Sequence, residues 1–255
     1  MADLWYTFFM DLSIIIPAYN EEKQLPLTMK RVLEFLTQRY KGTFELIVID
    51  DGSDDGTGKS VEAFISQYAT VRLVRVPQHK GRGVAVRQGI GMAHGELILE
   101  MDAGGGVDAE AIVRFAEYMN NHPDVGIIIG SRNIEGSCIL PKQPLLRVVR
   151  EYIFFILAWV LFGWDFRDRV NGFKMFRKQA ANDMFAFQHE TGFLAEAELV
   201  VIAECRKWKY ELLPVQWTEC RDSWIHPSQE SWRSLRGIFD IFRRARRGGY
   251  SRKTS

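Results

Sequence analysis

The chain has 255 residues, of which 47% are hydrophobic and 25% are charged, and its formal net charge is +1. This length and composition support one large domain with a full hydrophobic core. A net charge near zero gives no global field that favours nucleic acid, so no nucleic-acid partner is expected. Three widely separated cysteines, Cys138, Cys205 and Cys220, indicate a reducing compartment and no zinc site.

The N-terminal apolar run over residues 4–10 lacks a preceding basic region and ends at Asp11, so we predict no signal peptide. No apolar stretch reaches the ~18–20 residues that a spanning helix needs. The longest, over residues 152–162, fits either a buried helix or a helix lying on a membrane.

Strand and helix patterns alternate through the first half of the chain. Apolar, β-rich runs predict strands over residues 12–16, 45–49, 71–76, 96–101 and 125–129. Helical patterns lie between them, over residues 21–40, 58–68, 82–94 and 108–121. This alternation predicts an α/β fold in which a mostly parallel central sheet is flanked by helices.

The second half predicts a loop over 133–144, a helix over 145–162, a polar turn over 163–172, a strand over 173–176, a helix over 192–206 and a strand over 210–217. We divide the chain into a globular domain, 1–230, and a C-terminal segment, 231–255, formed by a basic amphipathic helix over 231–247 and a disordered tail. The apolar stripe of that helix either lies in a membrane interface or packs on the core with a solvated basic face.

Polar residues follow three of the predicted strands. Pro17 to Glu22 follow the first, Asp50 and Asp51 follow the second, and Asp102 follows the fourth. Ligands of open α/β sheets bind outside the carboxyl ends of the strands, so these residues predict one shared site. Carboxylates at 50 and 51 suit a nucleoside, although the same residues also suit an Asx turn with a helix cap.

Residues 78–87 open a helix with glycines, Lys80 and Arg82. Free helix N–H groups beside basic side chains suit a diphosphate, although a solvated basic turn gives the same pattern. Asp102 is a candidate ligand for a divalent cation, since hard cations take oxygen ligands and share them with substrate phosphates. Its alternative is a helix-capping role.

Basic and acidic residues beyond the fifth strand complete the candidate site. Arg132, Arg147 and Arg150 suit an acceptor phosphate that carries an apolar tail, because guanidinium groups bind phosphate in a bidentate manner. Glu196 and Glu198 are two residues apart on a predicted helix and do not share a face. One therefore points toward the site while the other caps or pairs, unless both are surface acids.

These motifs, in this order, resemble the family 2 inverting glycosyltransferases of GT-A fold, and most closely the dolichyl-phosphate and polyprenyl-phosphate β-glucosyltransferases. The resemblance extends from about residue 12 to 247. It rests on the segments after the strands, on 80–87 and on 130–132; the pairs Arg167-Asp168 and Trp217-Thr218, with Glu219 and Ser223, indicate the glucosyl branch. The chain departs from the family at Gly104, where a second carboxylate is usual, and at Glu196 and Asn171, where aspartate and cysteine are common.

The resemblance implies transfer of a hexose, most simply glucose from UDP-glucose, to a polyprenyl or dolichyl phosphate, giving a β-linked product for protein glycosylation. It implies that the nucleotide is held by Pro17, Ala18, Tyr19, Glu21, Asp50, Asp51, Lys80 and Arg82. It implies a catalytic set of Asp102, Arg132, Lys174, Glu196 and Glu198, with the acceptor phosphate at Arg132, Arg147 and Arg150.

The resemblance also implies Mg²⁺ or Mn²⁺ at Asp102. Our hypothesis is that the positive charges of Lys80 and Arg82 offset part of the metal binding lost at Gly104. It places the protein peripherally on the cytoplasmic side of a membrane, the endoplasmic reticulum in a eukaryote. Two alternatives stay open: a non-catalytic relative that binds a nucleotide sugar, and a transferase that uses a sugar hydroxyl as acceptor. The sequence specifies no oligomeric state.

Overall fold

The computed structural model describes residues 10–132, 134–135, 138–140, 155–163, 166, 169–192, 194–218 and 227–251. Side chains at 138–140, 218 and 227–235 lie outside this description. Within the residues described, no helix combines the length and the apolarity that crossing a bilayer requires.

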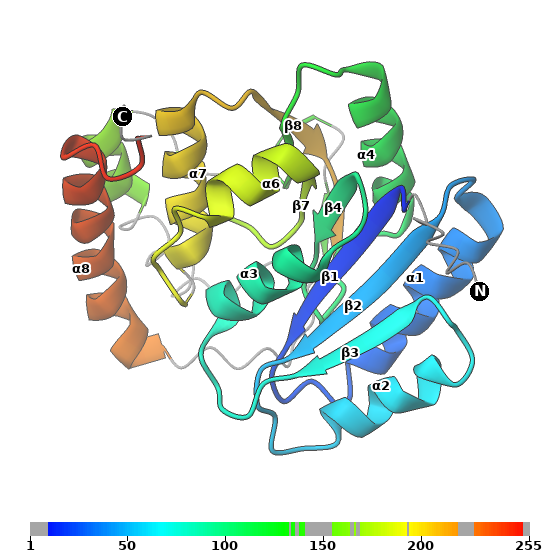
Figure 1. Ribbon diagram of the computed structural model, residues 1–255. Coiled ribbons are helices and arrows are strands. Elements are labelled where there is room, and N and C mark those ends of the chain that lie inside the picture. The colour runs from blue at the N-terminus through cyan, green and yellow to red at the C-terminus, as the bar shows by residue number, and fades with distance from the viewer. Residues whose placement is uncertain are drawn as a thin grey trace, which may run out of the picture.

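A seven-stranded sheet forms the centre of the molecule, in the order β3-β2-β1-β4-β7-β5-β8 (Figure 1). Its strands are β1 (Leu12–Ala18), β2 (Phe44–Asp50), β3 (Val71–Arg75), β4 (Leu97–Glu100), β5 (Ile127–Ser131), β7 (Lys174–Arg177) and β8 (Tyr210–Pro214). All neighbouring pairs are parallel except those of β7, which is antiparallel to both β4 and β5. A small parallel pair joins β6 (Cys138–Leu140) to β9 (Gln216–Thr218). The mostly parallel α/β sheet expected from the sequence is confirmed.

Helices cover both faces of the sheet. The first core contains buried side chains from α1 (Leu25–Arg39), α2 (Thr57–Ile65) and α4 (Glu110–Asn121). The second contains side chains from α3 (Arg82–Met92), α6 (Lys178–Phe185), α7 (Leu194–Arg206) and α8 (Pro227–Arg246). Figure 1 shows α8 on the outer side of α7, away from the sheet.

The residues of β1 explain why both faces need helices. Ile14 and Ile16 enter the first core and Ile15 enters the second, because successive side chains of a strand point to opposite faces. A strand buried on both faces is continuously apolar rather than alternating. This is why the run over 12–16 predicts an interior parallel strand.

Three details of the second half differ from the sequence-based expectation, and a fourth expected element is described only in part. The helix α6 was not predicted, because two of its four buried positions are Ala180 and Ala181, which give little hydrophobic contrast. The strand expected over 210–217 divides into β8, which pairs with β5, and β9, which pairs with β6 in the small second sheet. The loop expected over 133–144 contains β6. Of the helix expected over 145–162, the structure describes 155–162.

Helix α3 lies very close to the sheet at Gly89. A Cβ added to Gly89 would overlap Ile15 Cγ2 of β1, whereas a Cβ added to Gly91 of the same helix would meet nothing within 4 Å. We therefore expect Gly89→Ala to lower the free energy of unfolding by about 1–3 kcal/mol through overpacking. Gly91→Ala should leave it unchanged or raise it by up to ~1 kcal/mol, since alanine favours helix. Urea denaturation of both variants measures the difference, and equal effects would contradict this packing.

Candidate active site

One edge of the sheet gathers the carboxyl ends of the parallel strands. Ala18 at the end of β1 is paired with Asp50 at the end of β2. Because β7 runs antiparallel, its first residue, Lys174, lies at this same edge, opposite Glu100 of β4 and Ile129 of β5. The strand ends that were expected to form one site therefore do lie together.

The loop after β1 and the loop after β2 are joined by hydrogen bonds. The Asn20 backbone N–H donates to Ser53 Oγ at 3.0 Å, and the Glu21 N–H donates to Thr57 Oγ1 at 2.8 Å. In return, the Asp54 N–H donates to Asn20 Oδ1 at 2.9 Å. These contacts fix the two loops relative to each other before any ligand arrives.

Asp51 holds the loop that precedes α3. Its carboxylate accepts the Lys80 N–H at 3.0 Å and the Gly81 N–H at 2.8 Å, and His79 Nδ1 lies 2.9 Å away. The His79 ring stacks on Tyr19 with centroids 3.9 Å apart. Asp51 thus shapes the candidate diphosphate loop, while Asp50 Oδ1 accepts the Ser53 N–H at 3.0 Å within its own turn.

The N–H groups at the start of α3 are largely occupied. The Gly83 N–H donates to the Thr191 carbonyl at 2.7 Å, and the Val84 N–H donates to the Gly81 carbonyl at 3.0 Å. Gly81 has φ +99°, where other residues are strained, and a Cβ there would press on the Thr191 carbonyl. The start of α3 therefore does not offer the several free N–H groups that were expected to bind a diphosphate. The basic side chains of this loop are then the more important groups for binding it.

Arg82 is the centre of a cluster of carboxyl groups. Its Nη1 donates to Glu100 Oε1 at 2.5 Å and to Glu196 Oε1, and its Nη2 donates to Asp102 Oδ1 at 2.8 Å. Burial alone would lower the pKa of Arg82, but Glu100, Glu196 and Asp102 raise it. The guanidinium therefore stays charged and links α3, β4 and α7.

Lys174 extends this cluster toward β5. It is almost fully buried, and its Nζ donates to Glu196 Oε2 and to the Asn171 carbonyl. Asn171 in turn donates from Nδ2 to the Gly130 carbonyl at 2.7 Å. The segment before β7 is thereby fastened to the end of β5, beside Arg132.

Glu100 is the member of the cluster that sequence reasoning missed. It is completely buried, and its Oε2 lies among the described atoms without a hydrogen-bond partner. Burial and the neighbouring Glu196 raise the pKa of Glu100 to about 8, although Arg82 and Lys174 act against this. For Glu196 the balance reverses: burial would raise its pKa, but Lys174 and Arg82 lower it. The cluster thus sets the cations Arg82 and Lys174 against three carboxyl groups, of which Glu100 is the one that burial favours in its neutral form.

The remaining predicted site residues are placed as follows. Pro17 and Ala18 belong to the last part of β1, and Tyr19 is 40% exposed beside them. Burial raises the pKa of Glu21, and the charges of Asp102 and Asp55 raise it further, which places Glu21 near Asp102.

The Arg132 guanidinium stacks on the Trp217 ring, with Cζ 3.6 Å from the centroid. Arg147, Arg150, Arg167, Asp168, Glu219 and Ser223 lie outside the described residues.

Glu198 points away from Asp102, toward the C-terminal segment. Its Oε1 accepts from Arg244 Nη1 and from the Tyr250 hydroxyl, each at 2.7 Å. Its Oε2 accepts the N–H groups of His189 and Glu190, at 2.8 and 2.6 Å. The two glutamates thus have separate partners, as expected of residues two apart on a helix. Glu198 fixes the turn before Thr191, whose carbonyl contacts the loop at Gly83.

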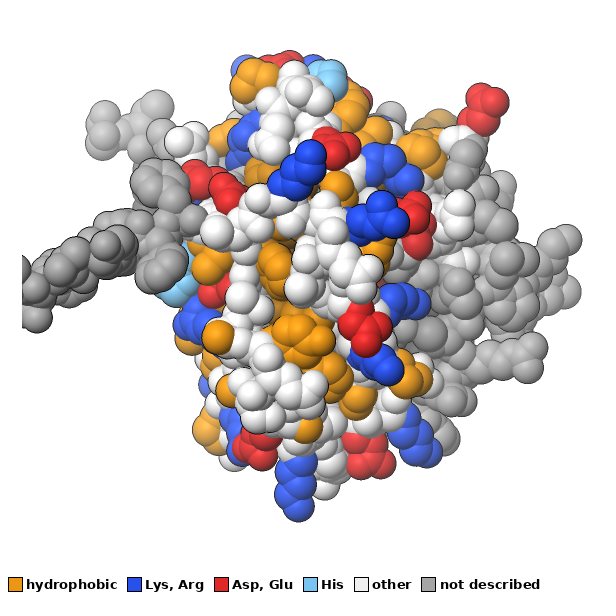
Figure 2. Space-filling view, turned by 90° about the vertical axis from the view of Figure 1, so that its right-hand side faces the viewer, with side chains coloured by type: hydrophobic (Ala, Val, Ile, Leu, Met, Phe, Trp, Pro, Cys, Tyr) orange, Lys and Arg blue, Asp and Glu red, His pale blue; other side chains and the backbone are white. Residues whose placement is uncertain are grey.

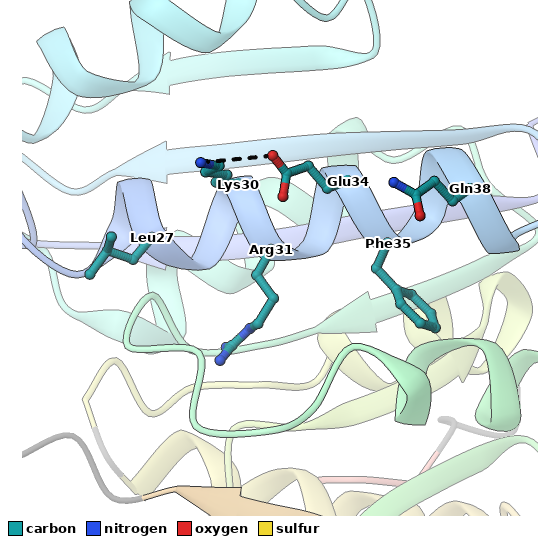
Figure 3. A pocket seen from close by; sticks show the side chains of 6 residues that line it. All are labelled: Leu27, Lys30, Arg31, Glu34, Phe35 and Gln38. Carbon is teal, nitrogen blue, oxygen red and sulfur yellow. Dashed lines mark ion pairs between the residues drawn. The ribbon is translucent and has the colours of Figure 1, made fainter.

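A shallow hollow runs along α1, and all of its lining residues come from that helix (Figure 3). Its lining includes Lys30, Glu34 and Phe35, and Arg31 points from the same helix toward the Gly105 carbonyl, to which it donates. On the face that Figure 2 shows, acidic and basic side chains are interspersed around small apolar areas. The described part of that face therefore presents no field of a single sign.

Comparison with known sequences identifies the family. A sequence model described as "Glycosyl transferase family 2" matches residues 13–185. The chain belongs to glycosyl transferase family 2. Among its relatives, the human dolichyl-phosphate β-glucosyltransferase is 32% identical over 237 residues, covering 89% of this chain and 73% of that protein. The enzyme from Dictyostelium discoideum is 31% identical over 239 residues, covering 90% and 73%.

Solved structures share the fold of this family 2 chain. Glucosyl-3-phosphoglycerate synthase from Mycobacterium tuberculosis, in complex with Mn²⁺, UDP-glucose and phosphoglyceric acid, superposes with a TM-score of 0.69 at 17% identity, covering 92% of this chain and 79% of that one. The complex of the same protein with UDP gives a TM-score of 0.65 at 14% identity, covering 92% and 80%.

The side chains at the strand ends do not fit a resident divalent cation. Asp102 has no second carboxylate two residues on, because residue 104 is glycine, and its Oδ1 is already bound by Arg82. Across the described residues, no three His, Cys, Asp or Glu side chains are grouped so that they could hold a metal ion. The guanidinium of Arg82 lies where the acidic residues converge.

The raised pKa of Glu100 predicts a pH-dependent stability. Between pH 4.5 and about 8 the folded chain keeps a proton that the unfolded chain has released, so the free energy of unfolding falls as pH rises. We expect wild type to lose roughly 1 kcal/mol per pH unit relative to Glu100→Gln, which cannot titrate. Denaturant melts from pH 5 to 8 measure this, and parallel curves for the two proteins would contradict it.

The contact between Tyr250 and Glu198 predicts a second stability effect. Tyr250→Phe removes a buried hydrogen bond to a carboxylate and should lower the free energy of unfolding by about 2 kcal/mol. Tyr210→Phe is a matched control, since Tyr210 donates to Glu204, which is exposed, and should cost less than ~1 kcal/mol. Guanidinium melts of both variants test this. An equal loss of unfolding free energy in the two would show that the Tyr250 hydrogen bond contributes no more than an exposed one.

Proposed function

We propose that this glycosyl transferase moves glucose from UDP-glucose to a dolichyl or other polyprenyl phosphate, with inversion at the anomeric carbon. The observation that carries the proposal is the meeting of Asp51, Arg82, Asp102 and Lys174 at one sheet edge, in a chain 32% identical over 89% of its length to a dolichyl-phosphate β-glucosyltransferase. Uridine would lie over the ends of β1 and β2, and the diphosphate would face the loop at residues 79–82.

The reaction is a direct displacement. An oxygen of the lipid phosphate forms a bond to C1 of glucose, and the bond from C1 to the β-phosphate of UDP breaks, with its electron pair leaving on UDP. A phosphate monoester has a second pKa near 6, so it is mostly dianionic at pH 7 and has no proton to lose. The site must hold two anions close together and stabilise the charge that develops on UDP.

Basic side chains suit that task. Arg82 and Lys174 belong to the cluster at the strand ends, and Arg132 lies at the end of β5, one strand beyond β7. We assign Arg82 to the leaving diphosphate and Arg132 to the acceptor phosphate, while the buried Lys174 acts as a positioning residue by neutralising Glu196. The assignments of Arg147 and Arg150 to the acceptor stay predictions.

The lipid acceptor would arrive from a membrane that contacts α8 and the helix over 155–162. Phe162 and Phe242 hold these two helices together, with ring centroids 5.4 Å apart. Ile156, Trp159 and Val160 are 51%, 57% and 65% exposed on one face of the shorter helix. Exposed arginines at 243, 246 and 247 end α8. An apolar face beside arginines suits an anionic leaflet, to which the protein would bind peripherally on the cytoplasmic side.

The two alternative functions predict other products. A non-catalytic relative would bind UDP without consuming UDP-glucose. A transferase acting on a sugar hydroxyl would need a general base. Glu198→Gln does not separate these cases, because Glu198 is occupied by Arg244, Tyr250 and two backbone amides.

A transfer assay tests the proposal. The full chain is incubated with a panel of nucleotide sugars and a short polyprenyl phosphate, and the products are weighed by mass spectrometry. We expect a glucosyl-lipid phosphate from UDP-glucose. Arg132→Lys should raise KM for the lipid phosphate about tenfold without changing the Kd for UDP, because lysine loses the bidentate fork.

Arg39→Lys is the control for this variant, since Arg39 is exposed at the far end of α1. UDP binding with no lipid product would support the non-catalytic alternative. Glucose found on an added sugar acceptor, and none on the lipid, would support the hydroxyl alternative.

A further inference from the structure

Several acidic side chains converge at the strand ends, and the guanidinium group of Arg82 lies among them. Arg82 contacts carboxyl oxygens from three different segments: Glu100 in β4, Asp102 after β4, and Glu196 in α7. The Arg82 side chain is 25% exposed and that of Asp102 is 39% exposed. The pair is therefore buried on one side and open on the other, where a ligand would lie.

The backbone is shaped around this pair. A Cβ on Gly172 would overlap both Asp102 Oδ1 and Arg82 Nη2, so the glycine leaves the space that the ion pair occupies. Gly81 and Gly83 bring the loop against the Thr191 carbonyl and Ala195, which sets the direction in which Arg82 leaves α3. Several segments thus hold the guanidinium in one position.

A divalent cation at this place would have to displace Arg82. Hard cations such as Mn²⁺ require oxygen ligands, and each carboxylate that touches Arg82 would have to exchange a charge-assisted hydrogen bond for a metal bond. Residue 104 adds no oxygen ligand from a side chain, because it is glycine. Mn²⁺ accompanies UDP-glucose in the M. tuberculosis synthase structure that shares this fold.

We propose that the Arg82 guanidinium is the built-in counter-ion of the nucleotide diphosphate, and that this chain binds UDP without a divalent metal ion. One edge of the guanidinium stays on Asp102, and the remaining Nη2 proton faces the phosphate. Arginine has five N–H donors in a planar fork, and the described contacts use four of them. This inference rests on the proposed function, since it concerns the same donor site.

Calorimetry with and without metal tests the inference. UDP is titrated into wild type in excess EDTA and in excess Mn²⁺, and the free Mn²⁺ signal is followed by electron paramagnetic resonance. We expect the Kd for UDP to agree within about threefold in the two conditions and the free Mn²⁺ signal to persist, since a tenfold change would need about 1.4 kcal/mol of metal contribution. A wild-type protein that binds UDP only with Mn²⁺ would overturn the inference.

Gly104→Asp is the decisive comparison, because it supplies the missing carboxylate. Gly104 is partly exposed and is not among the residues with positive φ, so its backbone conformation is one that L residues adopt. In this variant Mn²⁺ should strengthen UDP binding by tenfold or more and the free Mn²⁺ signal should fall. An equal response of wild type and Gly104→Asp to Mn²⁺ would count against the inference.

Arg82→Lys provides a second variant that keeps a positive charge within the buried carboxyl cluster. It should weaken UDP binding in EDTA about tenfold, because lysine has too few donors to hold the three carboxyl groups of the cluster and still present an N–H to the phosphate. Thermal unfolding confirms that the variant is folded, and an unchanged Kd would contradict the role of Arg82. The transfer assay separates the two proposals: UDP binding in EDTA without glucose transfer keeps this inference and removes the proposed function. Absence of UDP binding in both conditions removes both.

Discussion

The ion pairs of Arg82 are the constraint on which the rest of the site depends. Charges removed from water are costly unless their partners are close and well oriented, and breaking a buried pair costs several kcal/mol. Arg82 therefore fixes the first turn of α3 to the end of β4 and to α7. Lys174 can be almost completely buried because its ammonium group pairs with the second carboxylate oxygen of Glu196. The position of the donor loop follows from electrostatics inside the sheet edge rather than from the loop sequence alone.

A second buried carboxylate, that of Glu198, connects this part of the structure to the C-terminal segment. Glu198 joins the turn at 189–190 to Arg244 and Tyr250, and Thr191 in the same turn accepts the N–H of Gly83. A chain of hydrogen bonds thus runs from the C-terminal segment to the start of α3. The basic α8 shares its core with α7 through Ile238 and Ile241.

Local patterns revealed most of the fold and part of the site. An apolar strand followed by polar residues is a local pattern that a window of about ten residues contains. This is why Asp51 and Asp102 could be predicted from the sequence. Partners distant in the chain were not visible: Arg82 and Glu196 are 114 positions apart. Glu100 was missed because a carboxyl in a buried strand has no local signal beyond its alternation with Asp102. Tyr250 was placed in a disordered tail, although burial among α7 and α8 holds it. Pairings of this kind depend on topology, above all on β7 lying between β4 and β5.

The state of the carboxyl groups favours an acceptor that carries its own charge. A sugar hydroxyl must lose a proton as it attacks, so it needs a carboxylate that is free to accept one. In the Arg82 cluster, Asp102 and Glu196 are committed to ion pairs, and Glu100 is buried with its pKa raised. Releasing one of them as a base would leave a buried cation without its partner. A dianionic phosphate needs no such group and is attracted by the arginines that already surround the edge. The charge balance of the Arg82 cluster thus fits a phosphate nucleophile better than a sugar hydroxyl.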